Sequence, residues 1–125
     1  LPPVITARGS DPPRQIYNIN ADSAAAGLAE GLRARKLVFL SDVPGLLSDP
    51  NDRHSLMSTL HLSEVEDLIE RGIIGGGMLP KLDSCVEAIQ AGVGKVHLVD
   101  GRMPHSLLLE IFTKKGVGTE IIADE

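Results

Sequence analysis

The amino-acid sequence predicts an α/β domain, a three-layer αβα sandwich in which helices cover both faces of a mainly parallel sheet. Two stretches of strand length are typical of parallel strands buried on both faces: the continuous apolar run Leu37–Leu40, and Val96–Val99, which is apolar except for His97. Segments with helical spacing of apolar residues alternate with these runs, and this alternation indicates helices packed on a sheet. At 125 residues the chain fits a single domain with one core.

The first third of the chain is expected to hold two short extended segments and a helix. Val4–Thr6 and Gln15–Tyr17 flank a proline-containing turn, so they are predicted to pair as a hairpin or to lie as neighbouring extended pieces. Apolar residues then recur at helical spacing over Ala21–Arg33, where Asn20 or Asp22 can cap the helix. Small residues fill the first turns of this helix, which favours close packing on a sheet or leaves room for a ligand.

Two further helices are predicted in the middle of the chain. Ser63 and Glu66 have the spacing of a capping box, and Gly72 ends the apolar stripe that follows them. A second helix is expected from Pro80, which suits a first helical position, to Gly92. The other expected elements are a loop over Ser41–Ser48, a turn over Asp49–Asp52, a helix over Ser106–Phe112 and a strand over Thr119–Ile122.

Composition and charge exclude several classes of protein. The chain is 42% hydrophobic and 23% charged, which is typical of a globular domain and not of a disordered one. Its net charge is -5 and it has no dense basic stripe, so nucleic acid is a poor partner. No apolar run approaches the roughly 18 residues of a membrane span. The single cysteine, Cys85, can form no internal disulfide, which favours a cytoplasmic location.

The amino terminus predicts a longer natural chain. Leu1 is followed by two prolines and a valine, without an initial Met or a charged leader before an apolar stretch. We therefore expect Leu1 to mark a cut or an incomplete boundary.

Two polar segments are candidates for ligand binding because each adjoins a predicted strand. Ligands of open α/β sheets usually bind at the carboxyl ends of the strands. Asn18, Asn20 and Asp22 come just before the first helix, where they serve either as helix caps or as ligand contacts. The segment Asp42–Leu47 follows a buried strand with an acid and a Pro-Gly turn, which suits a plain turn as well as a ligand loop.

A third segment points to an anion. Glycines 75–77 lead to Pro80 and Lys81 at a helix start, where backbone N–H groups and the helix dipole attract negative charge. A lysine in the first turn opposes the dipole at a cost of a few tenths of a kcal/mol, so an anion is expected to compensate it. Phosphate is the natural candidate, and a solvated surface lysine is the alternative.

Several common site types have no matching motif. The chain contains neither a Walker-type G-x-x-x-x-G-K-[ST] nor a complete G-x-G-x-x-G fingerprint. Its histidines show no paired ligand spacing with one another or with Cys85, so they are expected at the surface or in packing rather than at zinc. Cys85 lies on the apolar stripe of its helix and is expected to act as a small buried hydrophobe rather than as a nucleophile. The four histidines are His54, His61, His97 and His105.

Three segments, Tyr17–Ala25, Ser41–Leu46 and Gly75–Lys81, closely resemble the acetylglutamate kinases of the amino acid kinase family, in the same order. The stretches Asp100–Ser106 and Glu110–Thr119 continue the likeness to nearly the whole chain. The resemblance is to the carboxyl-terminal half of that family only. It implies that residues 1–125 form the nucleotide-binding, carbamate kinase-like C-terminal lobe, and that the amino-terminal substrate lobe is absent.

The reaction implied by the resemblance moves the γ-phosphoryl group of ATP onto the side-chain carboxylate of N-acetyl-L-glutamate in arginine biosynthesis. By similarity, Lys81 neutralises charge on the phosphoryl group, Asp22 orients the catalytic lysines and Asn18 contacts the acyl amino acid. Mg²⁺ is expected to travel with the ATP phosphates and not in a dedicated protein metal site. The residues that the resemblance assigns to the nucleotide are Asp42, Val43, Pro44, Gly45, Leu46, Leu47, Ile73, Ile74 and Gly75.

The arginine-inhibited branch of the family implies that Glu110 and Gly116 contact arginine as an effector, whereas a solvated helix carboxylate is the alternative for Glu110. The full-length form is expected to be a homo-oligomer, and this lobe is expected to be inactive alone. Two other functions remain open: a stand-alone nucleotide- or arginine-binding regulatory module, and another acyl-amino-acid or aspartate-type kinase of the superfamily.

Overall fold

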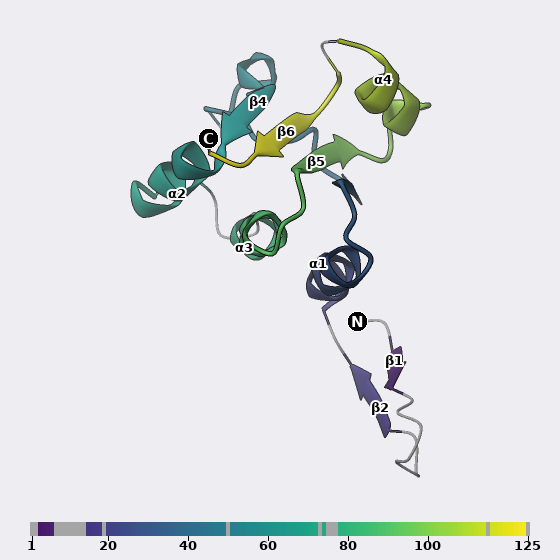
Figure 1. The fold of residues 1–125 in the computed structure, drawn as a ribbon. Coiled ribbons are helices and arrows are strands. Elements are labelled where there is room, and N and C mark those ends of the chain that lie inside the picture. The colour runs from purple at the N-terminus through teal and green to yellow at the C-terminus, as the bar shows by residue number, and fades with distance from the viewer. Residues whose placement is uncertain are drawn as a thin grey trace.

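In the part of the chain that the structure describes, a four-stranded sheet carries helices on both faces and follows a two-stranded hairpin (Figure 1). The computed structural model describes residues 3–6, 15–18, 20–49, 51–72, 74, 78–114 and 116–124. The elements in chain order are β1 (Pro3–Thr6), β2 (Gln15–Asn18), α1 (Ala21–Gly31), β3 (Lys36–Ser41), a 3-10 turn (Arg53–Ser55), β4 (Thr59–His61), α2 (Leu62–Glu70), α3 (Leu79–Gln90), β5 (Lys95–Asp100), α4 (Ser106–Phe112) and β6 (Thr119–Ile122).

The sheet has the strand order β3-β5-β6-β4 and is mainly parallel, as predicted. β3 pairs in parallel with β5, from Lys36 opposite Lys95 to Ser41 opposite Asp100, and β4 pairs in parallel with β6. β6 runs antiparallel to β5, with Thr119 opposite Leu98. The carboxyl ends of β3 and β5 and the amino ends of β6 and β4 therefore lie along one edge of the sheet, called the site edge below.

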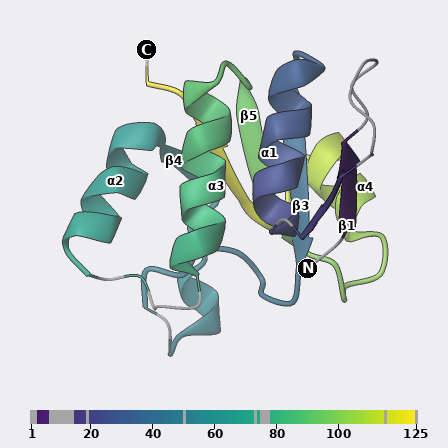
Figure 2. The ribbon, with the colours of Figure 1, turned by 90° about the horizontal axis from the view of Figure 1, so that it is seen from below.

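The helices form the two outer layers, which confirms the predicted three-layer sandwich. α1, α2 and α3 lie together on one face of the sheet and α4 lies on the other (Figures 1 and 2). Successive strand residues point to opposite faces, so Val96 and Leu98 of β5 join the core under the three helices. His97 and Val99 are also buried but lie outside that core cluster, on the face that α4 covers.

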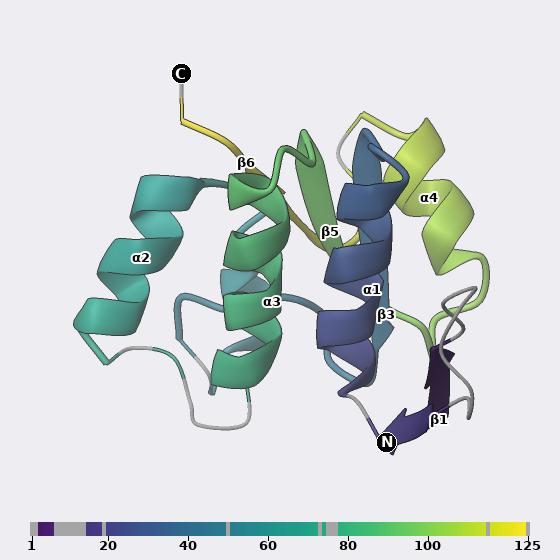
Figure 3. The ribbon, with the colours of Figure 1, turned by 60° about the horizontal axis from the view of Figure 1, so that its bottom comes forward.

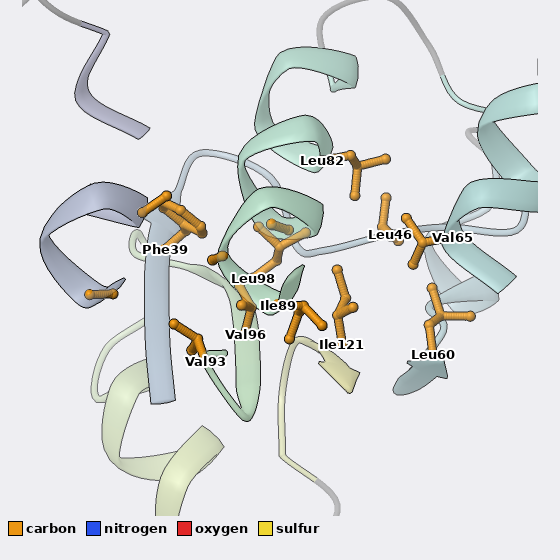
Figure 4. Close-up of a cluster of buried hydrophobic side chains, with 14 residues drawn as sticks. Phe39, Leu46, Leu60, Val65, Leu82, Ile89, Val93, Val96, Leu98 and Ile121 are labelled. Carbon is orange, nitrogen blue, oxygen red and sulfur yellow. The ribbon is translucent and has the colours of Figure 1, made fainter. Parts of the chain in front are cut away.

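The main core fills the space between the sheet and helices α1 to α3 (Figure 4). Burying an aliphatic side chain of this kind contributes roughly 1.5–3 kcal/mol, so this cluster holds the helices firmly on the sheet. The fully buried aliphatic members are Val65, Leu82, Val96, Leu98 and Ile121.

α4 has an unusual distribution of side chains. Its buried residues are polar, Ser106 and Glu110, whereas Leu108 and Phe112 on its outer side are 54% and 79% exposed. An amphipathic surface helix normally buries its apolar stripe. The polar contacts beneath α4 join Glu110 to the backbone of Val117 and Gly118, just before β6.

Most of the predicted elements are confirmed. β1 and β2 pair as an antiparallel hairpin, and the helix expected from residue 106 to residue 112 matches α4. Asn20 is the cap of α1, since its Oδ1 accepts hydrogen bonds from the backbone N–H groups of Asp22 at 2.9 Å and Ser23 at 3.3 Å. None of the helices within the described ranges has the length and apolar character needed to cross a membrane.

The predicted capping box of α2 is wrong. α2 begins at Leu62, and the N–H of His61 donates to the Glu64 carboxylate at 2.7 Å. Ser63 instead donates its hydroxyl to Asp124 at 2.9 Å. The cause is β4, which the sequence analysis did not predict. Its pairing with β6 ends at His61, and the chain turns into the helix without a linker.

Candidate functional site

The amino ends of α1 and α3 meet at the site edge. α1 precedes β3 and α3 precedes β5, and both helices return to the start of the strand that follows, so each begins near the carboxyl end of that strand. Figure 3 shows the two helices side by side with their amino ends at the bottom of the view. Each helix amino end carries partial positive charge and N–H groups without a partner inside the helix. This part of the site edge is therefore suited to bind an anion.

Lys81 of α3 and Asp22 of α1 form an ion pair across the two helix starts. The Lys81 Nζ donates to the Asp22 Oδ2 at 3.1 Å, and the two side chains are 23% and 25% exposed. The lysine is thus not a solvated surface residue. The anion that compensates it against the helix dipole is the Asp22 carboxylate, so no phosphate is needed to explain its position.

Cys85 lies one turn after Lys81 and is fully buried, as predicted. Burial and, to a smaller extent, the nearby Asp22 carboxylate raise the pKa of the Cys85 thiol to about 12. A thiol in this state is not a nucleophile at neutral pH. Cys85 therefore packs beneath the ion pair and takes no direct part in chemistry.

The segment Asp42–Leu47, called the β3 loop below, runs from the end of β3 toward β6. The backbone N–H of Leu46 donates to the Thr119 Oγ1 at 2.9 Å, and the Leu46 carbonyl accepts from the N–H of Met57 at 2.8 Å. Leu47 forms an isolated antiparallel bridge with Leu56. The loop is therefore tied to two other parts of the chain.

Accessibility differs along the β3 loop. Asp42 is exposed, Val43 and Pro44 are half-buried, and Gly45 is buried. The Leu46 side chain belongs to the hydrophobic core. A ligand at this loop would meet the stretch from Asp42 to Pro44 first, and nucleotide binding here stays a prediction.

Two polar residues at the end of β5 were missed by the sequence analysis. The Asp100 carboxylate accepts hydrogen bonds from the Arg102 backbone N–H at 2.9 Å and from its guanidinium at 3.0 Å. These bonds to Arg102 lower the pKa of Asp100. Asp42 adds a smaller attraction that raises the pKa of Arg102, after the larger contribution of Asp100. The available signal was an Asp-Gly-Arg sequence directly after a predicted buried strand.

The other residues predicted to touch substrate or nucleotide are placed only in part. Asn18 is the last residue of β2 and pairs with Pro3. It precedes Asp22 by four residues in the sequence. Ile74 is half-buried and packs against the core. Ile73 and Gly75 lie outside the described residues. The proposed contacts of these residues stay predictions.

Gly116 lies against the Glu110 carboxylate of α4, and α4 covers the opposite face of the sheet from α3, the helix that carries Lys81 (Figure 1). The buried Glu110 carboxylate accepts from the N–H of Gly118 at 3.1 Å and of Val117 at 3.4 Å. The expected alternative of a solvated carboxylate is therefore wrong. Gly116 has a φ of +66°, and a Cβ there would run into this carboxylate, so glycine is required.

His97 is buried beside Glu110 without a hydrogen bond. Its Nδ1 lies 3.9 Å from the Glu110 Oε1, too far for a hydrogen bond, and neither ring nitrogen has a partner in the described part of the structure. Burial lowers the pKa of His97, and the opposing effects of Glu110 and Glu120 are smaller. His97 is therefore neutral at pH 7, as a packing residue would be.

No metal site is found among the described residues. The described ranges contain no group of three or more His, Cys, Asp or Glu side chains that could hold a metal ion. A shallow hollow of ≈ 410 Å³ lies at the opposite edge of the sheet, where β3 and β5 begin, and is lined by residues including Arg33, Lys36 and Lys95. Within the described residues, the Lys81–Asp22 ion pair joins the two helix starts at the site edge.

Sequence comparison identifies the family to which the chain belongs. Residues 2–100 match the sequence model of the amino acid kinase family, so the chain belongs to this family. Among curated relatives, an acetylglutamate kinase from Syntrophomonas wolfei is 54% identical over 120 residues. The match includes 96% of this chain and 42% of that protein, so the chain spans about two fifths of its relative's length.

Two solved structures support the same fold. N-acetylglutamate synthase from Neisseria gonorrhoeae, complexed with coenzyme A and L-arginine, is 34% identical with a TM-score of 0.78, over 87% of this chain and 24% of that chain. Carbamate kinase from Giardia lamblia, bound to AMP-PNP, is 24% identical with a TM-score of 0.65, over 96% of this chain and 37% of that chain. The second match shows a shared fold alone.

Proposed function

We propose that the chain is the nucleotide-binding C-terminal lobe of a kinase that transfers the γ-phosphoryl group of ATP to the side-chain carboxylate of N-acetyl-L-glutamate, in arginine biosynthesis. The observation that carries the proposal is the Lys81–Asp22 ion pair between two helix amino ends. The 54% identity to an acetylglutamate kinase supports the choice of reaction. We further propose that the complete protein is a cytoplasmic homo-oligomer in which a separate lobe supplies most of the acyl-amino-acid pocket.

The proposed chemistry requires placement and charge neutralisation more than proton transfer. A side-chain carboxylate with an ordinary pKa of about 4.3 is already ionised at neutral pH, so the nucleophile needs no general base. Lys81 would place its ammonium group against the negative charge of the phosphoryl group in flight. Asp22 would hold that ammonium group in position, and it is itself positioned by the Asn20 cap at the start of α1.

The positive charges of the described residues suit the phosphates of a nucleoside triphosphate. The ammonium group of Lys81 and the amino ends of α1 and α3 would face its phosphates. The β3 loop and residues 73–75 would hold the rest of the nucleotide, and Asn18 would contact the acyl amino acid. Mg²⁺ bound to the phosphates would neutralise part of their charge, and this lobe needs no metal cage of its own.

We also propose that the Glu110 cluster binds arginine as an effector. Within the described residues, the one basic side chain within 4 Å of this buried carboxylate is His97, which is neutral. A guanidinium group would supply the missing positive charge through paired hydrogen bonds. In support, the similar N-acetylglutamate synthase was crystallised with L-arginine. Glu110→Gln should weaken inhibition by arginine in steady-state assays, and unchanged inhibition would exclude this role.

The Lys81→Ala variant of the complete polypeptide tests the kinase proposal. Removing transition-state charge stabilisation should lower kcat by about 10²–10³-fold while the KM for ATP changes far less. Lys114→Ala is the matched control, because Lys114 is an exposed lysine after α4. A normal kcat in the Lys81 variant would reject the assigned role.

Two measurements separate the other possible functions. A panel of N-acetyl-L-glutamate, other acyl amino acids and L-aspartate identifies the acceptor, and preference for a different acceptor would correct the proposal. Calorimetry with ATP and with arginine tests the alternative of a stand-alone binding module. A half-site should bind ATP weakly when the chain is alone, whereas a regulatory module should bind its ligand tightly without any turnover.

A further inference from the structure

We propose that Thr119 is a positioning residue that fixes the β3 loop for nucleotide binding. The proposal rests on the nucleotide-binding role proposed above for that loop. Thr119 is the first residue of β6 and is fully buried, and its Oγ1 accepts the hydrogen bond of the Leu46 N–H at 2.9 Å. This buried bond joins residues 73 positions apart in the sequence.

The contact between the loop and Thr119 is too close for most side chains. Gly45 has a φ of +140°, and a Cβ at this position would lie 2.6 Å from the Thr119 Oγ1 and 2.9 Å from Leu56 Cδ1. Only glycine accepts both this backbone conformation and this approach. The loop therefore has one way to pass over Thr119, and the hydroxyl is aimed at the next N–H in the chain.

Other elements hold Thr119 in place independently of the loop. Thr119 pairs with Leu98 in the antiparallel β5–β6 ladder. The residue before it, Gly118, donates its N–H to the buried Glu110 carboxylate, and a Cβ on Gly118 would meet the Leu98 carbonyl oxygen. The sheet and α4 therefore set the position of the hydroxyl, and the hydroxyl sets the position of the loop.

The bond fixes the downstream end of the accessible part of the loop. At the upstream end, Ser41 belongs to β3, and its carbonyl accepts from the N–H of Gly101 at 2.8 Å. At the downstream end, Leu46 is held through its N–H by Thr119 and through its carbonyl by Met57. The short stretch from Asp42 to Pro44 is thus fixed at both ends. A loop that is already ordered loses less freedom when it binds a ligand.

The test compares Thr119→Val with Thr119→Ser in the complete polypeptide. Valine has nearly the shape of threonine but accepts no hydrogen bond, whereas serine keeps the hydroxyl. Thr59→Val is the matched control, because the Oγ1 of this exposed residue on neighbouring β4 contacts Glu120 at 3.4 Å and not the loop. Amide hydrogen exchange over residues 43–48 reports the loop directly, and steady-state kinetics report its effect on ATP.

In Thr119→Val, we expect the Leu46 amide to exchange about tenfold faster or more, because its local opening becomes easier. The KM for ATP should rise by about three- to tenfold, while the KM for N-acetyl-L-glutamate stays within about twofold. Thr119→Ser should restore both values, and Thr59→Val should change neither. Unchanged exchange at Leu46, or a serine variant that behaves like the valine variant, would overturn the proposal.

Two further experiments make the test decisive. Should the valine variant not fold, exchange in the wild-type protein decides: Leu46 should exchange as slowly as the core of β5, and rapid exchange overturns the proposal. Asp42→Ala distinguishes a failure of the positioning role of Thr119 from a failure of the nucleotide-binding role of the β3 loop. If Asp42→Ala raises the KM for ATP and Thr119→Val does not, the positioning role is wrong and the nucleotide role stands. If neither variant changes the KM for ATP although the Leu46 amide exchanges faster in Thr119→Val, the nucleotide role of the loop is wrong.

Discussion

The Lys81–Asp22 pair should contribute measurably more to stability than an ordinary surface ion pair of the same length. The protein contains its own reference, because Asp67 of α2 and Arg71, which follows the last residue of α2, also approach to 3.1 Å. We suggest two double-mutant cycles, with each acid changed to Asn, each base changed to Met, and both changes combined. The coupling energy of each cycle isolates the pairwise interaction from the other effects of the substitutions.

The expected magnitudes follow from exposure and from chain connectivity. Arg71 and Asp67 are 63% and 58% exposed and four residues apart at the end of one helix, so their coupling should be about 0.3–0.5 kcal/mol. Lys81 and Asp22 are 23% and 25% exposed, so water and salt screen them less, and their coupling should be about 1 kcal/mol. It should not reach the 3–5 kcal/mol lost when a fully buried pair is broken, since both groups keep some contact with water.

Urea unfolding at pH 7, followed by circular dichroism, gives the free energies of unfolding for both cycles. Repeating the cycles in about 0.5 M NaCl should remove most of the Arg71–Asp67 coupling and a smaller part of the Lys81–Asp22 coupling. A coupling at Lys81–Asp22 no larger than that of the surface pair would refute the reasoning. It would mean that the two helix starts are not held together by these charges.

Three other predictions follow from buried side chains. Leu82→Ala should lower the free energy of unfolding by about 2–5 kcal/mol, measured by urea denaturation, because Leu82 is fully buried in the core. Cys85 should resist iodoacetamide at pH 8 in the native protein and react only in urea, since its pKa is raised to about 12; mass spectrometry showing rapid native alkylation would contradict this. The pKa of His97 is lowered in the folded state, so the unfolded chain takes up its proton first and stability should fall as the pH drops below about 6.5. Thermal unfolding between pH 7.5 and 5.5 should show a weaker pH dependence in His97→Gln, and equal slopes would exclude His97 as the cause.

The larger elements of the fold could be predicted because their sequence signals are local. A continuous apolar run marks β3, a stretch that is apolar except for His97 marks β5, and an amide at the helix start marks the Asn20 cap. β4 has only three residues and gains its identity from pairing with β6, so no local pattern reveals it. The same pairing explains the misplaced capping box, because Ser63–Glu66 and His61–Glu64 have equal spacing and only the end of β4 selects between them.

Residue patterns alone predicted the residue types of the candidate site, whereas the link between Asp22 and a catalytic lysine was implied only by the family resemblance. Helix physics indicates that Lys81 needs an anion, yet the identity of that anion depends on how α1 and α3 pack, and it proves to be Asp22. The sequence left two roles open for Glu110, an effector contact implied by the resemblance and a solvated helix carboxylate. Its burial follows from the loop before β6, where the N–H groups of Val117 and Gly118 turn inward to this carboxylate.

The reversed direction of β6 has a consequence for how the molecule assembles. If β6 ran parallel to β5, Thr119 would lie at the far edge of the sheet and could not reach Leu46. Because it runs the other way, a loop made from residues near position 45 takes its final form only after β6 has docked. Contacts of such long sequence separation form late, since a large chain closure must precede them. During synthesis on the ribosome, the surface proposed to receive ATP would therefore be among the last parts of this lobe to mature.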